Sequence, residues 1–289
     1  CDLEKAQVEW FSGGKTNITY NCLDRHLEER GDQRAVIWES NDIDADVAVV
    51  TYRELHRKVC QFSNLLVSQG IKKGDRVCIY MPMILEGAVA MLACARIGAV
   101  HSVIFAGFSA KSLAGRIQDC GAKALITADL LFRGNKELVL FDIAKEALQE
   151  CDSVEVVIGH KRSKESIFDE NVLVWQDEVE KHSEEHEAEI MDANDPLFIL
   201  YTSGSTGKPK GILHNVAGYM VYAGYSFKNV FQYQDGDVHF CRADFGWITG
   251  YSYLVYGPLL NGATSLMFEG VPTYPTAARF SQMIEKHHV

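Results

Sequence analysis

The chain has 289 residues, 47% of them hydrophobic, which is enough to bury a full core. Its formal net charge of −11 argues against nucleic acid and anionic membrane surfaces as partners, so a polyanionic ligand would need a local cluster of donors. The sequence contains no signal-peptide pattern and no apolar run of the ~18 residues that a membrane span requires. We therefore expect neither nucleic-acid nor membrane binding.

The cysteines point to a reducing compartment. The chain has eight cysteines without a CxxC pair, and Cys60, Cys78 and Cys94 lie in apolar runs. We expect these three to be reduced core residues, which favours a cytoplasmic location. The ten histidines show no metal-ligand spacing, and no metal site is predicted.

The predicted elements alternate between strands and helices in two series. The first series is a strand at 47–50, a helix from a capping box at Thr51 and Glu54 to Gly70, a strand at 77–81, a helix at 85–96, a strand at 102–105, a helix at 109–121 and a strand at 124–127. The second is a strand at 197–202, a helix from Val216, a strand at 238–241, a helix at 253–260, a strand at 264–268 and a helix at 275–286. Continuous apolar strands between helices predict an α/β fold with mostly parallel sheets flanked by helices.

An acidic stretch separates the two series. Residues 177–195 contain nine carboxylates and one lysine. Such a charge run is typical of a solvated helix or linker rather than a metal site.

The most informative segment is 201–211, which follows an apolar strand. It holds three glycines, five hydroxyl-bearing residues and two lysines. Glycines let the backbone approach a ligand closely, hydroxyls and N–H groups donate to phosphate oxygens, and lysines offset charge. The spacing differs from a Walker A motif, because Pro209 stands where that motif needs Ser or Thr. A plain surface turn is the alternative that composition alone favours.

This segment resembles the signature of the adenylate-forming superfamily, and further matches resemble acetyl-CoA synthetases. Those matches occur in the right order at 10–14, 20–26, 77–82, 93–102, 257–264 and 268–275. The resemblance runs from about Trp10 to Val289 and is weak only near 130–190. It implies stacked sheets and a small barrel in a large domain, followed by a C-terminal lid. Both chain ends look cut, so we expect an incomplete large domain without the lid, inactive by itself.

On this basis we divide the chain into four parts. Residues 1–50 are expected to be an N-terminal extension that packs on the large domain, and 51–175 a first α/β subdomain. Residues 176–195 would be an acidic connector, and 196–289 a truncated second subdomain that carries the phosphate loop.

The resemblance implies an AMP-forming acetate–CoA ligase with ATP, Mg²⁺ and CoA as co-substrates and acetate as the acid. Mg²⁺ would arrive with ATP. The alternatives are a propionyl- or other short-chain acyl-CoA synthetase and a non-catalytic nucleotide-binding module. No catalytic residue can be identified in this chain, since the family's lid lysine and its adenine- and ribose-binding motifs would lie beyond Val289. The residues expected to bind the ATP phosphates are Thr202, Ser203, Gly204, Ser205, Thr206, Gly207 and Lys208.

Two further sites follow from the resemblance. Trp247, Ile248 and Thr249 would contribute to the acyl pocket, although a tight turn with a core tryptophan is an even alternative. Many relatives have His where this chain has Tyr251, which leaves the role of that position open. The expected CoA-binding residues are Gly107, Arg133 and Lys136, with a basic surface turn as the alternative for the two cations.

Overall fold

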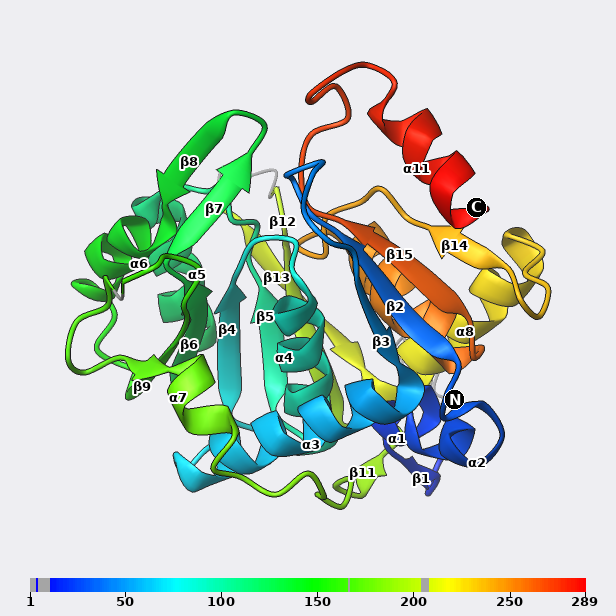
Figure 1. Cartoon of the computed structure of the whole chain (residues 1–289). Helices are drawn as coiled ribbons and strands as arrows, with labels where there is room; N and C mark the ends of the chain where they lie inside the picture. The colour runs from blue at the N-terminus through cyan, green and yellow to red at the C-terminus, as the bar shows by residue number, and fades with distance from the viewer. Residues whose placement is uncertain (1–3, 5–10, 166, 204–207) are drawn as a thin grey trace.

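Two large sheets organise the part of the chain that the computed structural model describes, namely residue 4 and residues 11–165, 167–203 and 208–289 (Figure 1). The larger sheet has the order β10-β9-β6-β4-β5-β12-β13 and is parallel except at its antiparallel edge strand β13. Its strands are β4 (Arg76–Tyr80), β5 (Val100–Val103), β6 (Ala124–Ala128), β9 (Val156–His160), β10 (Leu173–Val174), β12 (Pro196–Thr202) and β13 (Lys210–Asn215).

The smaller of the two has the order β14-β15-β2-β3, in which only the β2–β3 pair is antiparallel. Its strands are β2 (Arg34–Glu39), β3 (Ala48–Thr51), β14 (Val238–Phe240) and β15 (Thr264–Phe268). Two short ribbons complete the strands: β1 (Lys15–Thr16) with β11 (Met191–Asp192), and β7 (Leu130–Arg133) with β8 (Lys136–Val139).

Sheet membership does not follow chain order. The larger sheet combines β4, β5, β6, β9 and β10 with β12 and β13, which come after the acidic stretch. The smaller sheet combines β2 and β3 with β14 and β15. The expected fold class, with mostly parallel sheets flanked by helices, is confirmed. The division into an extension, two subdomains and a connector stays a prediction.

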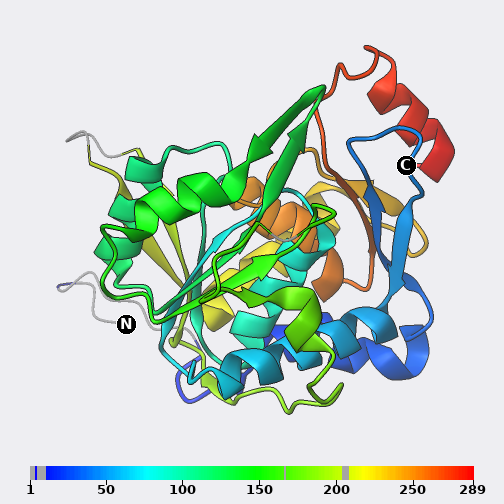
Figure 2. The same cartoon turned by 60° about the vertical axis from the view of Figure 1, so that its left-hand side comes forward.

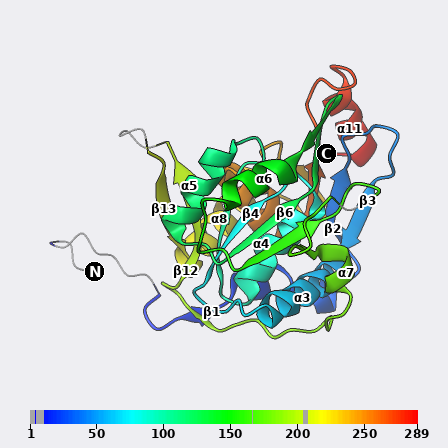
Figure 3. The ribbon, with the colours of Figure 1, turned by 90° about the vertical axis from the view of Figure 1, so that its left-hand side faces the viewer.

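The helices cover and separate the sheets (Figures 1 and 3). They are α1 (Ile18–Cys22), η1 (Asp24–His26), α2 (Leu27–Arg30), α3 (Tyr52–Ser68), α4 (Leu85–Arg96), α5 (Ala110–Cys120), α6 (Leu140–Leu148), α7 (Trp175–Val179), α8 (Val216–Val230), α9 (Ile248–Gly250), the π-helical turn η2 (Tyr251–Tyr256), α10 (Gly257–Leu260) and α11 (Arg279–His287). Every residue of α4 except Glu86 is buried, as expected for a helix that is apolar on all sides and packed between layers.

Helix α3 begins where its capping signal predicts. The Thr51 hydroxyl accepts from the Glu54 N–H at 3.2 Å, and the Thr51 N–H donates to the Glu54 carboxylate at 2.8 Å. These two bonds satisfy the backbone N–H groups of Thr51 and Glu54 at the helix start, and the predicted capping box is confirmed.

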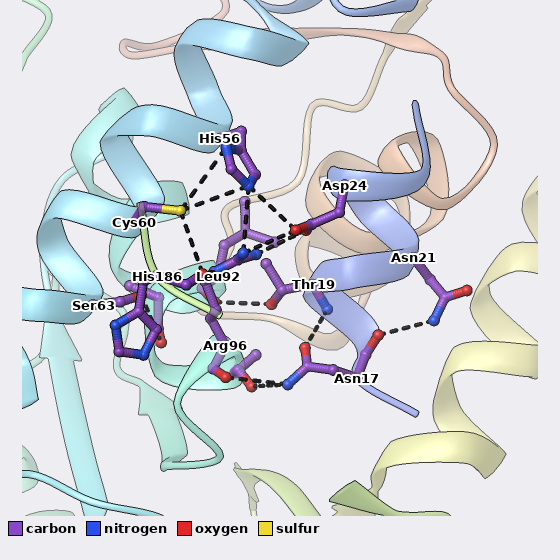
Figure 4. Close-up of polar contacts among 12 residues, drawn as sticks. Asn17, Thr19, Asn21, Asp24, His56, Cys60, Ser63, Leu92, Arg96 and His186 are labelled. Carbon is purple, nitrogen blue, oxygen red and sulfur yellow. Dashed lines mark hydrogen bonds and ion pairs between the residues drawn. The ribbon is translucent and has the colours of Figure 1, made fainter. Parts of the chain in front are cut away.

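A buried charge cluster joins the N-terminal segment to the core (Figure 4). Asp24 accepts two 2.8 Å hydrogen bonds from the guanidinium of Arg96, whose side chain is only 2% exposed, and a third contact at 3.2 Å from His56. Burial opposes ionisation of Asp24, but the hydrogen bonds from Arg96 and His56 prevail and lower its pKa. Burial likewise acts to lower the pKa of His56, yet the bond to Asp24 outweighs it and raises that pKa to about 9.

The acidic stretch is fastened to this cluster. Arg96 Nε donates to the carbonyl of His186 at 2.8 Å, and the Asn17 amide donates to the carbonyls of Ala95, Arg96 and Glu189. The segment is thus held against α4 by side chains that bind its backbone, while its own carboxylates remain largely on the surface.

Two predicted elements differ from the structure. The segment after the phosphate loop, expected to lead directly into a helix, first forms β13, which pairs antiparallel with β12. The last helix begins at Arg279 rather than near 275.

Among the residues that the structure describes, none of the helices combines the length and the apolar character that a membrane span requires. Cys60, Cys78 and Cys94 are fully buried free thiols, as predicted.

Candidate active site

The carboxyl ends of strands from both large sheets meet around one cavity of about 210 Å³. Residues that follow β4 and β5 line it from the larger sheet, and residues that follow β14 and β15 line it from the smaller one. In the larger sheet β5 lies on one side of β4, and β6, which follows β5 in the chain, lies on the other side. This reversal makes β4 a topological switch point. Open α/β sheets bind ligands at such points, outside the carboxyl ends of the strands.

A second cavity, of about 380 Å³, adjoins the first and shares Phe105 with it. It lies at the end of the pairing between β5 and β12, which joins His101 to Phe198. Beyond that pair, Val103 and Leu200 line the cavity from the two strands.

The predicted phosphate loop connects β12 to β13 at the rim of the second cavity. Thr202 is the last residue of β12 and pairs with Lys210, and both Thr202 and Ser203 are exposed. Ser203 lines the second cavity, whereas Lys208 lines a neighbouring groove of about 660 Å³ along α5. Gly204, Ser205, Thr206 and Gly207 lie outside the described residues.

The loop connects two antiparallel strands, and the next helix along the chain lies away from it. Helix α8 begins only after the six residues of β13, about 20 Å along the strand. A helix dipole acts within its first turn and contributes nothing at that distance.

Arg116 is a positively charged residue of this site that the sequence analysis did not predict. Arg116 of α5 lines both the second cavity and the α5 groove, and its guanidinium stacks on Phe108 at 4.5 Å and Tyr201 at 5.6 Å. It forms no ion pair with any described residue, and burial lowers its pKa. Its charge is available to an anionic ligand, but α5 carried no sequence signal for it.

Trp247 lines the second cavity, and its role as an acyl-pocket residue stays a prediction. Its side chain is 50% exposed and packs with its ring centroid 6.1 Å from that of Phe105 and 6.3 Å from that of Phe108. The alternative of a core tryptophan is therefore wrong. Ile248 and Thr249 follow at the start of α9 with exposed side chains and are not among the residues that line this cavity.

The turn that presents Trp247 is held by Asp244. One Asp244 carboxylate oxygen accepts from the Gly246 N–H at 2.7 Å, and its carbonyl accepts from the Trp247 N–H at 3.1 Å. A Cβ at Gly246 would lie 2.9 Å from the Phe105 backbone, so the close approach of these two segments requires glycine. Burial raises the pKa of Asp244 to about 6, although the Gly246 N–H and the charge of Arg133 act against the shift.

Two buried tyrosines support the walls of the site. Tyr251 is fully buried, and its hydroxyl accepts from the Val103 N–H at 2.7 Å, just where the β5–β12 pairing has ended. Tyr80 donates to the carbonyls of Ala106 and Phe108, which fixes the turn between the two cavities. The role of Tyr251, which the sequence left open, is to support the cavity wall from behind.

The predicted CoA residues fall on two adjacent segments. Gly107 and Arg133 both line the first cavity. A Cβ at Gly107 would lie 2.4 Å from the Phe105 ring, so glycine keeps this turn compact. Lys136 is exposed and pairs with Arg133 across the β7–β8 turn.

Arg133 and Lys136 are like charges directly opposite each other in an antiparallel pair. Such a pair destabilises a sheet, because the two Cβ atoms lie only about 5 Å apart. Neither side chain forms an ion pair with a described residue. The arrangement suits an anionic ligand better than it suits the stability of the hairpin.

Among the described residues, no group of three or more His, Cys, Asp or Glu side chains is arranged to hold a metal ion.

Comparisons with known proteins agree with this geometry. The model of the family of AMP-binding enzymes matches residues 23–289, and the chain belongs to that family.

Within the family the chain is similar to acetyl-CoA synthetases, as the sequence motifs predicted. It is 54% identical to the acetyl-coenzyme A synthetase of Syntrophobacter fumaroxidans, over 98% of this chain and 44% of that protein. It is 56% identical to acetyl-coenzyme A synthetase 2 of Pseudomonas aeruginosa, over 100% of this chain and 45% of that protein. The chain thus spans less than half the length of these two relatives.

A solved structure extends the comparison to the fold. The acetoacetyl-CoA synthetase from Streptomyces lividans superposes with a TM-score of 0.89 at 29% identity, over 96% of this chain and 42% of that one. The adenylate-forming fold expected from the sequence is confirmed.

Proposed function

We propose that this chain is the nucleotide- and CoA-facing part of an AMP-forming acetate–CoA ligase. The observation that carries the proposal is the convergence of three predicted sites on the turn at 105–107. The phosphate hairpin and Trp247 adjoin the cavity on one side of that turn, and Arg133 lines the cavity on the other side.

In the first half-reaction, an acetate oxygen attacks the α-phosphorus of ATP and pyrophosphate leaves. The hydroxyls of Thr202 and Ser203 and the charge of Lys208 would hold the β- and γ-phosphates, with Mg²⁺ entering as the MgATP substrate. Fixing these phosphates orients the α-phosphorus for in-line attack, so the contribution of this chain is positioning and charge stabilisation. Arg116 would add a further positive charge beside the same phosphates.

Trp247 would close the acyl end of the second cavity. A bulky wall suits a two-carbon acid, and each extra methylene can be rejected by only about 1–3 kcal/mol. Acetate should therefore be preferred over propionate, but not exclusively.

In the second half-reaction, the CoA thiol attacks the acyl carbon and AMP leaves. Arg133 and Lys136 would bind the phosphorylated adenosine end of CoA, and the thiol would approach past Gly107. Phe105 borders both cavities, so the thiol and the acyl-adenylate would meet beside it. We also propose a cytoplasmic location, in keeping with the buried free thiols.

The test is acetate-dependent exchange of labelled pyrophosphate into ATP by the full-length protein, with propionate run alongside. Exchange that is fastest with acetate supports the adenylating half-reaction and the substrate together. Exchange with a longer acid alone keeps the mechanism and overturns acetate. Absence of exchange with every acid overturns the ligase and favours a non-catalytic nucleotide-binding module.

A further inference from the structure

The hairpin β7–β8 carries the two predicted CoA cations but belongs to neither large sheet. Its two four-residue strands pair only with each other, and it projects toward the β2–β3 connection (Figures 1 and 2). An isolated two-stranded hairpin is marginally stable in water, so the direction of its tip depends on outside contacts. The described structure provides such contacts at the base and at the tip.

The base is held by Arg162. Its guanidinium lies over the Phe132 ring at 4.6 Å and donates to the Leu130 carbonyl at 3.2 Å. It also forms a bidentate salt bridge, in which its two terminal nitrogens donate to the two carboxylate oxygens of Glu269 at 2.6 and 2.7 Å. The Glu269 side chain is only 2% exposed. Glu269 follows β15, so this pair ties the base of the hairpin to the smaller sheet.

The tip is hydrogen-bonded by the side-chain amide of Asn41. Asn41 follows β2, and its side chain exchanges two hydrogen bonds with the backbone of Gly134, which lies between the cations. The Asn41 amide nitrogen donates to the Gly134 carbonyl at 2.8 Å, and its oxygen accepts from the Gly134 N–H at 2.7 Å. Asn41 is only 8% exposed, so loss of the amide would leave both backbone groups without this partner in a partly buried place.

The backbone at this point favours the same geometry. Gly134 has φ +63°, at the first turn position between Arg133 and Lys136, where a type II′ hairpin has glycine. A Cβ there would lie 3.4 Å from Val271, so the turn also packs closely against the chain that follows β15. Asn41 itself is fixed by its neighbour, since Arg279 donates to the Ser40 carbonyl at 3.1 Å.

We propose that Asn41 is a positioning residue for CoA. It fixes the Gly134 turn and thereby holds Arg133 and Lys136 together beside the first cavity. This inference rests on the proposed function, because it takes the ligand of the two cations to be the phosphorylated end of CoA. Asn41 acts through the turn and is not expected to touch CoA itself.

The experiment compares Asn41→Ala, Asn41→Asp and Arg133→Ala in the full-length protein. The readouts are the KM for CoA in the complete reaction and the acetate-dependent pyrophosphate exchange, which needs no CoA. Asn64→Ala is the matched control, because the Asn64 amide also binds two backbone carbonyls, those of Ser183 and Glu185, at a place remote from the cavity.

We expect Asn41→Ala to raise the KM for CoA about tenfold while pyrophosphate exchange stays within about twofold of the wild type. Asn41→Asp should give an intermediate KM, because Asp can accept from the Gly134 N–H but cannot donate to the carbonyl. Arg133→Ala should raise the KM for CoA at least as much. The double variant should have a KM close to that of Arg133→Ala alone, because both changes remove the same interaction, that of Arg133 with CoA. Asn64→Ala should leave the KM unchanged.

An unchanged KM in Asn41→Ala, together with a raised KM in Arg133→Ala, would overturn the inference and leave the CoA assignment standing. Equal losses of exchange and of CoA use in Asn41→Ala would also overturn it, because they indicate a general loss of structure. If Arg133→Ala leaves the KM unchanged, the inference fails together with the CoA assignment. Intact exchange would then still support the adenylating half of the proposed function.

Discussion

Asp24→Asn tests whether the buried charge cluster in Figure 4 stabilises the fold. The substitution keeps the shape of the side chain but removes its charge and places an NH₂ group against the guanidinium of Arg96. That guanidinium is 2% exposed and has no other carboxylate partner among the described residues. Breaking a buried pair costs about 3–5 kcal/mol, because the remaining charge is left uncompensated.

The partial exposure of Asp24, 19% of its side chain, favours the lower end of that range. We therefore expect a loss of about 3 kcal/mol. At about 2 °C per kcal/mol for a chain of this size, the Tm should fall by about 6 °C in thermal unfolding at pH 6. Asp32→Asn is the control, because Asp32 pairs with Arg53 on the surface with 91% of its side chain exposed. Such a pair contributes at most about 1 kcal/mol.

The Tm difference between the wild type and Asp24→Asn should also depend on pH, because Asp24 binds His56. The folded-state pKa of His56, about 9, lies above its ordinary value of 6.5, so the charged imidazole stabilises the wild type fully below pH 6.5. That contribution is lost as the pH rises through 9. The difference in pKa corresponds to at most about 3 kcal/mol, which partial exposure reduces to about 1–2 kcal/mol. The Tm difference between wild type and Asp24→Asn should therefore be smaller at pH 9.5 than at pH 6.

Two results would refute this reasoning. A Tm for Asp24→Asn within about 1 °C of that for Asp32→Asn would show that the cluster contributes no more than a surface pair. A Tm difference from wild type that is the same at pH 6 and pH 9.5 would show that His56 is not charged in the folded state.

Three further predictions concern packing, acid specificity and pH. Gly87→Ala should destabilise the chain by about 1–3 kcal/mol in thermal unfolding, because the new Cβ would lie 2.4 Å from the buried Phe245 ring. Gly115→Ala on α5 is the control. It should be neutral or slightly stabilising, because a Cβ there would meet open space. In the full-length protein, Trp247→Gly should raise the ratio of kcat/KM for propionate over acetate about tenfold or more, and an unchanged ratio would remove Trp247 from the acyl pocket. Burial raises the pKa of Asp244 from 3.8 to about 6, so its favourable contribution is complete below pH 3.8 and lost as the pH rises through 6. The Tm of Asp244→Asn minus the Tm of the wild type should therefore be larger at pH 8 than at pH 4. A Tm difference that does not change with pH would contradict this.

The local sequence determined the elements whose signals are local. The capping box at Thr51 fixed the start of α3, and the apolar run before Tyr201 predicted β12. The pair Arg133 and Lys136 was predicted from the resemblance alone, and the structure places the two residues opposite each other across the β7–β8 turn.

Only the tertiary structure decided which strands share a sheet and which residues support the site. Strands far apart in the sequence pair through backbone groups that every residue has, so β2 beside β15 left no signature in the chain. The contacts of Asn41 and Arg116 follow the same rule. The role of a polar side chain depends on the groups that it contacts in the folded chain. For Asn41 these are the backbone groups of Gly134, 93 residues away in the sequence.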